Sequence, residues 1–477
     1  MGGEGKSHRR AIVGLAWPVY VELLAGVIAG VVDVAWVARL GPAPMAAVAL
    51  ATNLENLVLG LILVATAGTT VLIAARTTLA GRRAAIRGGV TLAAATTVAV
   101  VGAGSLMRGP VVDLFFDAGE AEARHAALGF LAISIPGLAV SFAQLTVDAV
   151  FKGLGDTRTP MRLAMGTNAL ILVLDPTLIY GFGLGVRGAA LATVASRFVM
   201  FAVGWALVRH RSLGDETTAE AGAEEVERAV VGVGAPSRST AARLTPAAVA
   251  APAPLPRRSV PTGILTETLE VARAGAPLGG DFLARMAGAT ALATVVATFG
   301  VAAVAAYGIG TKAMYFASMA FYAVRQAATI HTARSQPGQA SRIGRAAVTV
   351  GVGLGLVAAL VYAGAAPWIM AAFTDRGDVA AVGVEFLRWL ALYLVPISAV
   401  ISLSGTLAAG RGRSRLLLVT LAGTVALVVL ARGLAGPFGL AGVWAAMCGS
   451  AALQCAALLV LLRRLGAGAP LSAGTRP

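Results

Sequence analysis

Two aspartates interrupt long apolar stretches of the chain at matching depths. Asp33 and Asp175 each lie eight residues before the glycine that ends their stretch, which is about 12 Å from that end along a helix. Thr193 lies about 8 Å inside the stretch that follows. Two carboxylates in an apolar medium can take up and release protons near neutral pH, or bind Na⁺ together with hydroxyl and amide oxygens. The spacing therefore predicts a cation site formed by Asp33, Asp175 and Thr193.

Other polar residues are candidates for the same region. Glu55 and Lys312 lie roughly 16–18 Å deep in their stretches and are candidates for a substrate cavity. Asn168 and Gln144 offer amide groups to a cavity or to a sodium shell. Pro176 can kink its helix and free a backbone carbonyl. The alternative is that the two aspartates only hydrogen-bond neighbouring helices and hold them together.

Several charged residues have a simpler explanation. Asp281 precedes Arg285 by one helical turn, so we expect a local ion pair. Asp148 and Lys152 have the same spacing and the same expected pairing. Arg325 lies about 37 Å along its helix, so we expect its side chain to reach the cytoplasm.

The composition identifies the elements that hold these residues. Of 477 residues, 57% are hydrophobic and 13% charged, against roughly 25% charged in a soluble protein. The mean hydropathy is +0.81. These values exclude a soluble enzyme, a nucleic-acid-binding protein and a disordered chain. The two cysteines lie too far apart on one helix for a disulfide, and neither Cys/His zinc spacing nor another metal motif is present, so no metal or cofactor is expected.

About twelve apolar stretches are long enough to cross a bilayer core of roughly 30 Å. They span residues 12–38, 44–74, 88–108, 126–150, 160–182, 187–209, 265–299, 302–331, 343–372, 381–409, 413–435 and 438–464. Shifting the chain by about 259 residues superimposes proline, glycine and acidic positions of the two halves. The sequence therefore predicts an all-α polytopic membrane protein with two parallel six-helix repeat lobes.

The predicted domains are an N-terminal lobe (1–209), a flexible linker (210–262) and a C-terminal lobe (263–477). The linker begins with an acidic cluster and ends in a Pro/Ala run. Roughly twenty basic residues fall in the segments on the side of the termini and about seven on the opposite side, which predicts cytoplasmic termini and a cell-membrane location. This bias accounts for most of the net charge of +15 without a nucleic-acid partner.

Four separated motifs resemble the multidrug and toxic compound extrusion family, in particular its prokaryotic branch related to the DNA-damage-inducible transporters. They are Trp17-Pro18 with Asp33 and Leu40-Gly41, KGLGDTRTPM at 152–161, LDPTLIYG at 174–181 and GVRGAALAT at 185–193. The resemblance covers nearly the whole chain outside 210–262. It implies a twelve-helix exporter that exchanges substrate for inward H⁺ or Na⁺, with Asp33 and Asp175 carrying the cation and Thr193 beside them.

One position departs from that branch, which usually has an asparagine where this chain has Ile171, one turn before Asp175. Losing an oxygen ligand weakens a Na⁺ site more than a proton site, so H⁺ is favoured and Na⁺ is the alternative. We expect an antiporter for amphipathic compounds, not an enzyme, with a small-molecule substrate, lipid contacts and a monomeric state. The rival function is a lipid-linked saccharide flippase of the same superfamily, for which Lys312 and Arg285 are the basic candidates.

Overall fold

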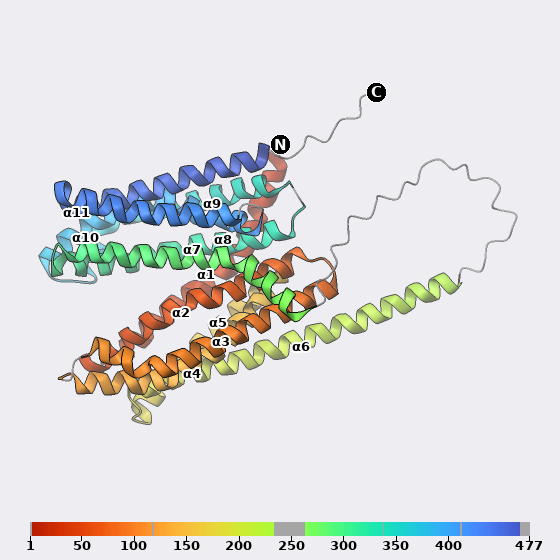
Figure 1. The fold of residues 1–477 in the computed structure, drawn as a ribbon, viewed down its shortest axis with the longest axis horizontal. Helices are drawn as coiled ribbons and strands as arrows, with labels where there is room; N and C mark the ends of the chain where they lie inside the picture. Colours follow the sequence, from red (N-terminus) through yellow and green to blue (C-terminus); the bar gives the residue numbers. More distant parts are fainter. Residues whose placement is uncertain (1, 117–118, 233–262, 337, 411–412, 468–477) are drawn as a thin grey trace.

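The computed structural model describes residues 2–116, 119–232, 263–336, 338–410 and 413–467, and in them the chain is helical (Figure 1). The first lobe contains α1 (Gly2–Ala38), α2 (Pro42–Ala75), α3 (Leu79–Phe115), α4 (Ala121–Gly153), α5 (Arg158–Pro176), the short π-helix η1 (Thr177–Gly181) and α6 (Val186–Gly232). The second contains α7 (Ile264–Ala297), α8 (Val301–Arg334), α9 (Ala340–Ala371), α10 (Gly377–Ala409) and α11 (Arg413–Ala467). Gly439 has φ 59° inside α11, so this element consists of two helices. The described residues thus form twelve helical spans, as predicted.

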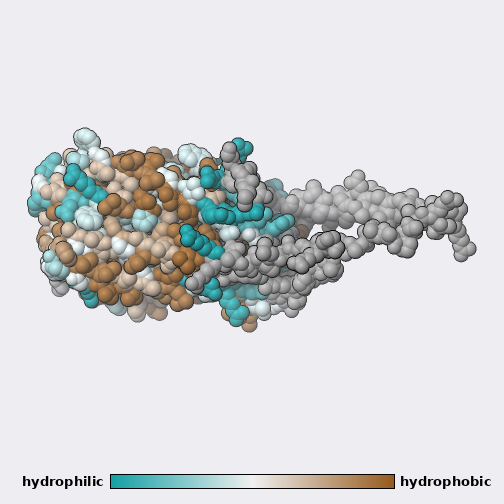
Figure 2. All heavy atoms as spheres, turned by 90° about the horizontal axis from the view of Figure 1, so that it is seen from above, coloured by the Kyte–Doolittle hydropathy of each residue, from teal (hydrophilic) through white to brown (hydrophobic). Residues whose placement is uncertain are grey.

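On the face seen in Figure 2, apolar side chains cover the middle of the molecule between more hydrophilic ends. In the described residues, nine helices are long and apolar enough to cross a membrane, with α11 contributing one long segment. Only α7 and α8 fall outside this set, because charged residues such as Asp281, Arg285 and Lys312 lower their mean hydropathy. The protein is therefore a multi-pass membrane protein.

The internal repeat is visible in the backbone. Gly41, before α2, has φ 112°, and Gly300, before α8, has φ 97°. These two glycines are superimposed by the sequence repeat, and both adopt a conformation that side chains of L-residues rarely reach. The first two helices of each lobe are therefore joined by the same glycine turn.

One boundary differs from the expectation. The predicted linker begins at residue 210, but α6 continues without interruption to Gly232. The segment 211–232 is rich in Ala and Glu and contains no proline, so its composition is compatible with helix. Residues 233–262, which hold the rest of the predicted linker, lie outside the described residues.

The lobes are packed together over the half of the molecule nearest the predicted cytoplasmic side, which we call the inner half. There α2 and α7 cross so closely that a Cβ added to Gly275 would overlap the carbonyl oxygen of Val64. A Cβ on Gly68 would likewise overlap the carbonyl oxygen of Val271. Beside this crossing, α1 and α8 share a buried apolar cluster that includes Val19 and Ala323 (cluster members Ile12, Ala16, Val19, Ala323, Val324, Ala327 and Ala328).

In the outer half, the same faces of α2 and α7 are exposed. Gly60 of α2 lies against Leu283 of α7. Seven residues further toward the outer end, on the same faces, Asn53 and Thr290 are both exposed. Figure 1 shows the two groups of helices diverging in this direction. Toward the outer end, the lobes therefore separate and the facing sides of α2 and α7 are exposed; we call these exposed sides the central cleft.

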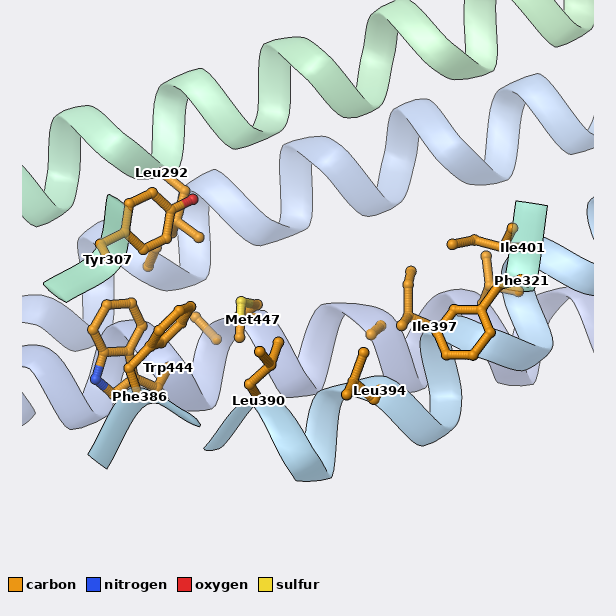
Figure 3. Packing of buried hydrophobic residues seen from close by; sticks show 14 of the residues in the cluster. Leu292, Tyr307, Phe321, Phe386, Leu390, Leu394, Ile397, Ile401, Trp444 and Met447 are labelled. Atoms are coloured by element: carbon orange, nitrogen blue, oxygen red, sulfur yellow. The ribbon is translucent and has the colours of Figure 1, made fainter. Parts of the chain in front are cut away.

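The interior of the C-terminal lobe is aromatic toward its outer end. Tyr307 stacks on Trp444 at 6.0 Å between ring centroids, and Phe386 packs against both (Figure 3). Leucines and isoleucines from α10, including Leu390 and Leu394, continue this core toward the inner half (Figure 3). This apolar packing holds α8, α10 and α11 as one unit.

Candidate functional site

A pair of carboxyl groups lies inside the N-terminal lobe. The carboxyl groups of Asp33 on α1 and Asp175 on α5 lie side by side, close enough to act on each other. Asp175 is fully buried, and among the described residues neither of its carboxylate oxygens meets a donor. An ionised carboxylate only accepts hydrogen bonds, so a contact between two carboxyl groups is satisfied when one of them holds a proton. The structure thus brings together the two aspartates that the sequence analysis selected, and their role in coupling stays a prediction.

The local structure of α5 positions this pair. The helix ends at Pro176, and the next residues form the wider π turn η1, a geometry that often occurs at functional sites. Tyr180 in this turn donates a hydrogen bond to the Trp36 carbonyl oxygen at 2.6 Å, and the two rings meet edge to face. Because Trp36 lies one turn after Asp33, this contact fixes the end of α5 against α1 beside the carboxyl pair.

Arg197 on α6 belongs to the same site, although the sequence analysis did not select it. Its Nη1 donates to the Ser141 hydroxyl on α4 at 2.6 Å. Its charge acts on Asp33 and on Glu55, and the Glu55 carboxyl on α2 lies beside Ser134. Asp33, Glu55, Asp175 and Arg197, which we call the carboxyl site, therefore combine three acids with one cation.

A signal for Arg197 was present in the sequence. Arg197 lies eleven residues after the start of α6, about 16 Å along the helix, which is near the middle of a membrane. A guanidinium at that depth needs an acidic partner or water. Depth alone would have added Arg197 to the candidates.

The remaining candidates of the N-terminal lobe have other environments. Thr193 is half-buried on α6, one turn before Arg197, and makes no hydrogen bond among the described residues. Gln144 is buried and donates to the Thr167 hydroxyl at 3.2 Å, so this amide joins α4 to α5. Asn168 has a buried Nδ2 without a partner in the described residues. Within the described part of the chain, no hydrogen bond joins any of these three residues to the carboxyl pair.

Lys312 on α8 has the position of a cleft residue. It lies eleven residues from Ala323, on the face of α8 that packs against α1 in the inner half. Phe316, on the same face, is exposed, and so is Lys312. Since the lobes separate in the outer half, this face borders the central cleft there.

A second charged cluster lies in the C-terminal lobe and overturns one expectation. Asp281 on α7 pairs with Arg285 at 3.1 Å, as its spacing predicted. It also pairs with Arg325 of α8 at 2.8 Å and accepts a hydrogen bond from Thr420 of α11 at 2.7 Å. The expectation that Arg325 reaches the cytoplasm is wrong, because its guanidinium is buried by this tertiary partner. We call Asp281, Arg285, Arg325 and Thr420 the arginine cluster.

The inner ends of the helices carry polar contacts between the lobes. Arg87 of α3 forms a two-point contact with Glu267 of α7, Nη2–Oε1 2.8 Å and Nε–Oε2 3.3 Å. Arg76 of α2 pairs with Glu270 of α7 at 2.5 Å. We call these two pairs the inner latch. The same end also holds the 3.0 Å contact of the His8 and His331 rings and a hydrogen bond from Arg334 to the Gly153 carbonyl oxygen at 3.4 Å.

Lys152 pairs with a different residue from the expected Asp148. Its Nζ lies 2.7 Å from the Glu22 carboxylate of α1, whereas the expected partner Asp148 lies close by without that contact. The pair joins α1 to α4 within the first lobe.

Comparison with protein families explains the doubled architecture. The model of the MatE family matches residues 18–177 and, a second time, residues 277–446. The chain belongs to the MatE family. Its members are transporters, and each match to this MatE protein falls within one lobe.

Curated relatives agree with this membership. The MatE protein is similar to the probable multidrug resistance protein NorM of Thermotoga maritima, with 34% identity over 200 residues, 40% of this chain and 42% of the relative. It is similar to DNA damage-inducible protein F of Escherichia coli, with 33% identity over 114 residues, 23% of this chain and 25% of the relative. The matched segments span less than half of these relatives.

Solved structures share the fold over nearly the whole chain. The MATE transporter VcmN of Vibrio cholerae in its bent form has a TM-score of 0.79 at 19% identity and covers 97% of this chain and 98% of its own. A MOP superfamily transporter from Pyrococcus furiosus has a TM-score of 0.72 at 20% identity, covering 96% of each chain. At these identities the likeness establishes the twelve-helix fold.

Proposed function

We propose that this MatE protein is a secondary active antiporter that exports amphipathic organic compounds from the cytoplasm in exchange for inward H⁺. The observation that carries the proposal is the contact between the carboxyl groups of Asp33 and Asp175. Two ionised carboxylates that lie side by side repel each other, whereas one shared proton replaces the repulsion by a hydrogen bond. Proton occupancy therefore changes the energy of packing α1 against α5.

The proton is favoured over Na⁺ by the surroundings of the pair. A bound Na⁺ needs several fixed oxygens, but the residue one turn before Asp175 is the buried, apolar Ile171. Thr193 makes no hydrogen bond with either aspartate. Arg197 already supplies a positive charge to Asp33 and Glu55, and this charge repels a second fixed cation. A proton needs only one carboxyl oxygen.

Helix α1 provides a physical route from this site to the contact between the lobes. Its outer half holds Asp33 against α5, and its inner half packs against α8 through Val19 and Ala323. A change in the α1–α5 packing on protonation therefore acts on a helix that belongs to both contacts. In the present arrangement the inner latch is formed and the outer halves are apart, so the carboxyl site takes protons from the outside and the cleft releases substrate there.

The same proposal includes the setting of the protein. The excess of basic residues in the segments on the side of the termini supports a cell-membrane location with both termini in the cytoplasm. Transport in this account requires one copy of the chain, a small-molecule substrate and surrounding lipid, with H⁺ as the coupling ion and no cofactor.

Proton movement on substrate addition tests the proposal. Proteoliposomes are loaded with a pH-sensitive dye, and a cationic or an anionic amphipathic substrate is added to one side. Wild-type protein is expected to move protons opposite to the substrate, and Asp175→Asn to abolish this while remaining folded and inserted. Asp378→Asn is the matched control, because Asp378 is an exposed aspartate paired with Arg376 outside the carboxyl site. Full proton movement by Asp175→Asn would overturn the assignment.

A further inference from the structure

The arginine cluster has more positive than negative charge. Arg285 and Arg325 both pair with the single carboxylate of Asp281, which is fully buried. The other groups whose charges act on Arg285 are the phenols of Tyr322 and Tyr393, which are neutral at physiological pH. Among the described residues the cluster therefore keeps one uncompensated cation inside the C-terminal lobe.

An uncompensated buried guanidinium is costly. Removing a charge from water costs several kcal/mol unless a partner of opposite charge replaces the water. Thr420 does not compensate the charge, because its hydroxyl is neutral and donates its hydrogen bond to Asp281. A structural ion pair between α7 and α8 would need only one of the two arginines. The second arginine therefore needs another explanation.

The unused donors of the cluster indicate what the second arginine binds. The Nε–H of Arg285 is buried and has no acceptor among the described residues. The guanidinium of Arg325 lies over the ring of Tyr322 at 5.8 Å and uses Nη1 for Asp281. Arg285 itself is only partly buried, with 16% of its side chain exposed. A guanidinium with a free Nε–H presents the two-point geometry that suits carboxylate and phosphate groups.

We propose that Arg285 and Arg325 bind the anionic group, a carboxylate, sulfonate or phosphate, of an amphipathic substrate. The anion supplies the missing charge and the missing acceptor together. Its apolar part has a surface available, because the aromatic side chains of Tyr315 and Phe316 on α8 are exposed in the same lobe. This inference rests on the proposed transport function and specifies its substrate class as anionic or zwitterionic amphiphiles.

Dye binding to the whole purified protein tests this site. The probes are the anionic carboxyfluorescein and the cationic rhodamine 6G, which share a ring system of similar size. Arg285→Gln is expected to weaken carboxyfluorescein binding by about tenfold or more, since a charge-assisted hydrogen bond contributes about 1.5–3 kcal/mol. Arg285→Lys, which keeps the charge but loses the two-point geometry, is expected to lose less. Rhodamine 6G binding is expected not to weaken in either variant.

The matched control is Arg273→Gln. Arg273 lies on the same helix about three turns nearer the cytoplasmic end, where it is exposed. Arg273→Gln makes the same change in net charge as Arg285→Gln and is expected to leave carboxyfluorescein binding unchanged. Equal losses in Arg273→Gln and Arg285→Gln would mean that the overall charge, and not the cluster, attracts the dye, and would overturn the proposal.

Thermal unfolding separates binding from a purely structural role. Arg285→Gln leaves the neutral Asp281–Arg325 pair intact, so the melting temperature without dye is expected to stay the same or rise. A structural role predicts a lower melting temperature with unchanged dye affinity, and that result would overturn the proposal. Nanodiscs with and without phosphatidylglycerol distinguish the two sources of an anionic group. If carboxyfluorescein binds in nanodiscs without phosphatidylglycerol but not in nanodiscs that contain it, the lipid headgroup occupies the cluster. That result would contradict the substrate assignment.

The outcomes are independent of those for proton coupling. If carboxyfluorescein binding depends on Arg285 but no dye moves protons, the transport proposal fails and the binding site stands. If dye efflux is proton-coupled but insensitive to Arg285, the coupling proposal stands and the anion site fails.

Discussion

Asp33 and Asp175 meet through their carboxyl groups inside the N-terminal lobe, and Asp175 has no contact with solvent. The pair is held from one side by the Tyr180 hydroxyl bound to the Trp36 carbonyl. The negative charge of the pair is partly balanced by Arg197, whose positive charge acts on Asp33. This arrangement requires a proton or another cation whenever the two carboxyl groups are in contact.

The first prediction separates Asp33 from Thr193. Asp33→Asn is expected to abolish ion-driven efflux, because an amide cannot release a proton. Thr193→Ala is expected to reduce efflux by less than about twofold, because a proton site does not need its hydroxyl oxygen. Initial efflux rates in proteoliposomes at equal protein content measure both. A loss of efflux in Thr193→Ala as large as in Asp33→Asn would indicate a metal-ion shell instead.

The second prediction uses the position of Ile171. Ile171→Asn places an amide oxygen one turn before Asp175 and is expected to make efflux depend on Na⁺, measured as efflux rate against Na⁺ concentration at constant pH. Leu172→Asn is the control, because the neighbouring side chain is exposed and points away from the site. A Na⁺ response that is equal in the two variants, or absent from both, would contradict the ligand-count argument.

Sequence alone predicted much of this architecture, because span length and the depth of a residue along a helix follow from the 1.5 Å rise. This is why the twelve spans were found and why Asp33 and Asp175, at equal depth, were selected. The repeat also superimposes Gly41 on Gly300, and the structure shows the same glycine turn at both. The spans and the aspartate depths depend on positions along one segment.

Contacts between segments were harder to predict. Arg325 was expected at the cytoplasmic surface because its buried partner Asp281 lies on another helix. Lys152 was assigned to Asp148 on its own helix, although Glu22 of α1 forms the shorter contact. The depth of Arg197 can be read from the sequence, but its acidic neighbours Asp33 and Glu55 lie on other helices. In each case the partner depends on which helix faces meet, and the repeat pattern does not contain that information.

The third prediction concerns the inner latch. Glu267 is buried and held at two points by Arg87, so Glu267→Gln, which removes the charge of this pair, is expected to weaken closure at the inner end. Maleimide labelling from the outside reports this at Asn53→Cys in the central cleft, with Cys448 and Cys455 replaced by serine. The labelling rate is expected to fall.

The control for the latch is Asp113→Asn, which removes an exposed ion pair with Arg124 within the first lobe. It is expected to leave the labelling rate unchanged. If Glu267→Gln also leaves labelling unchanged, the Arg87–Glu267 pair does not stabilise the outward-open arrangement.

The fourth prediction uses the helix crossing at Gly275. Gly275→Ala introduces a methyl group that overlaps the Val64 carbonyl oxygen, and overpacking of this kind costs about 1–3 kcal/mol. Because the contact joins two lobes, we expect slower outside labelling of Asn53→Cys and slower efflux. Gly308→Ala on α8 is the control, since a Cβ there meets no atom. Equal effects of the two alanines would show that the crossing is not sensitive to close packing.

The most direct test of proton coupling is efflux from proteoliposomes with the two ion gradients imposed separately. The carboxyl site predicts that efflux follows ΔpH at constant Na⁺ and continues when all Na⁺ is replaced by K⁺. Efflux that stops without Na⁺ and does not respond to ΔpH would contradict the account. Asn168 and the backbone around Pro176 would then have to complete a sodium shell around Asp33 and Asp175.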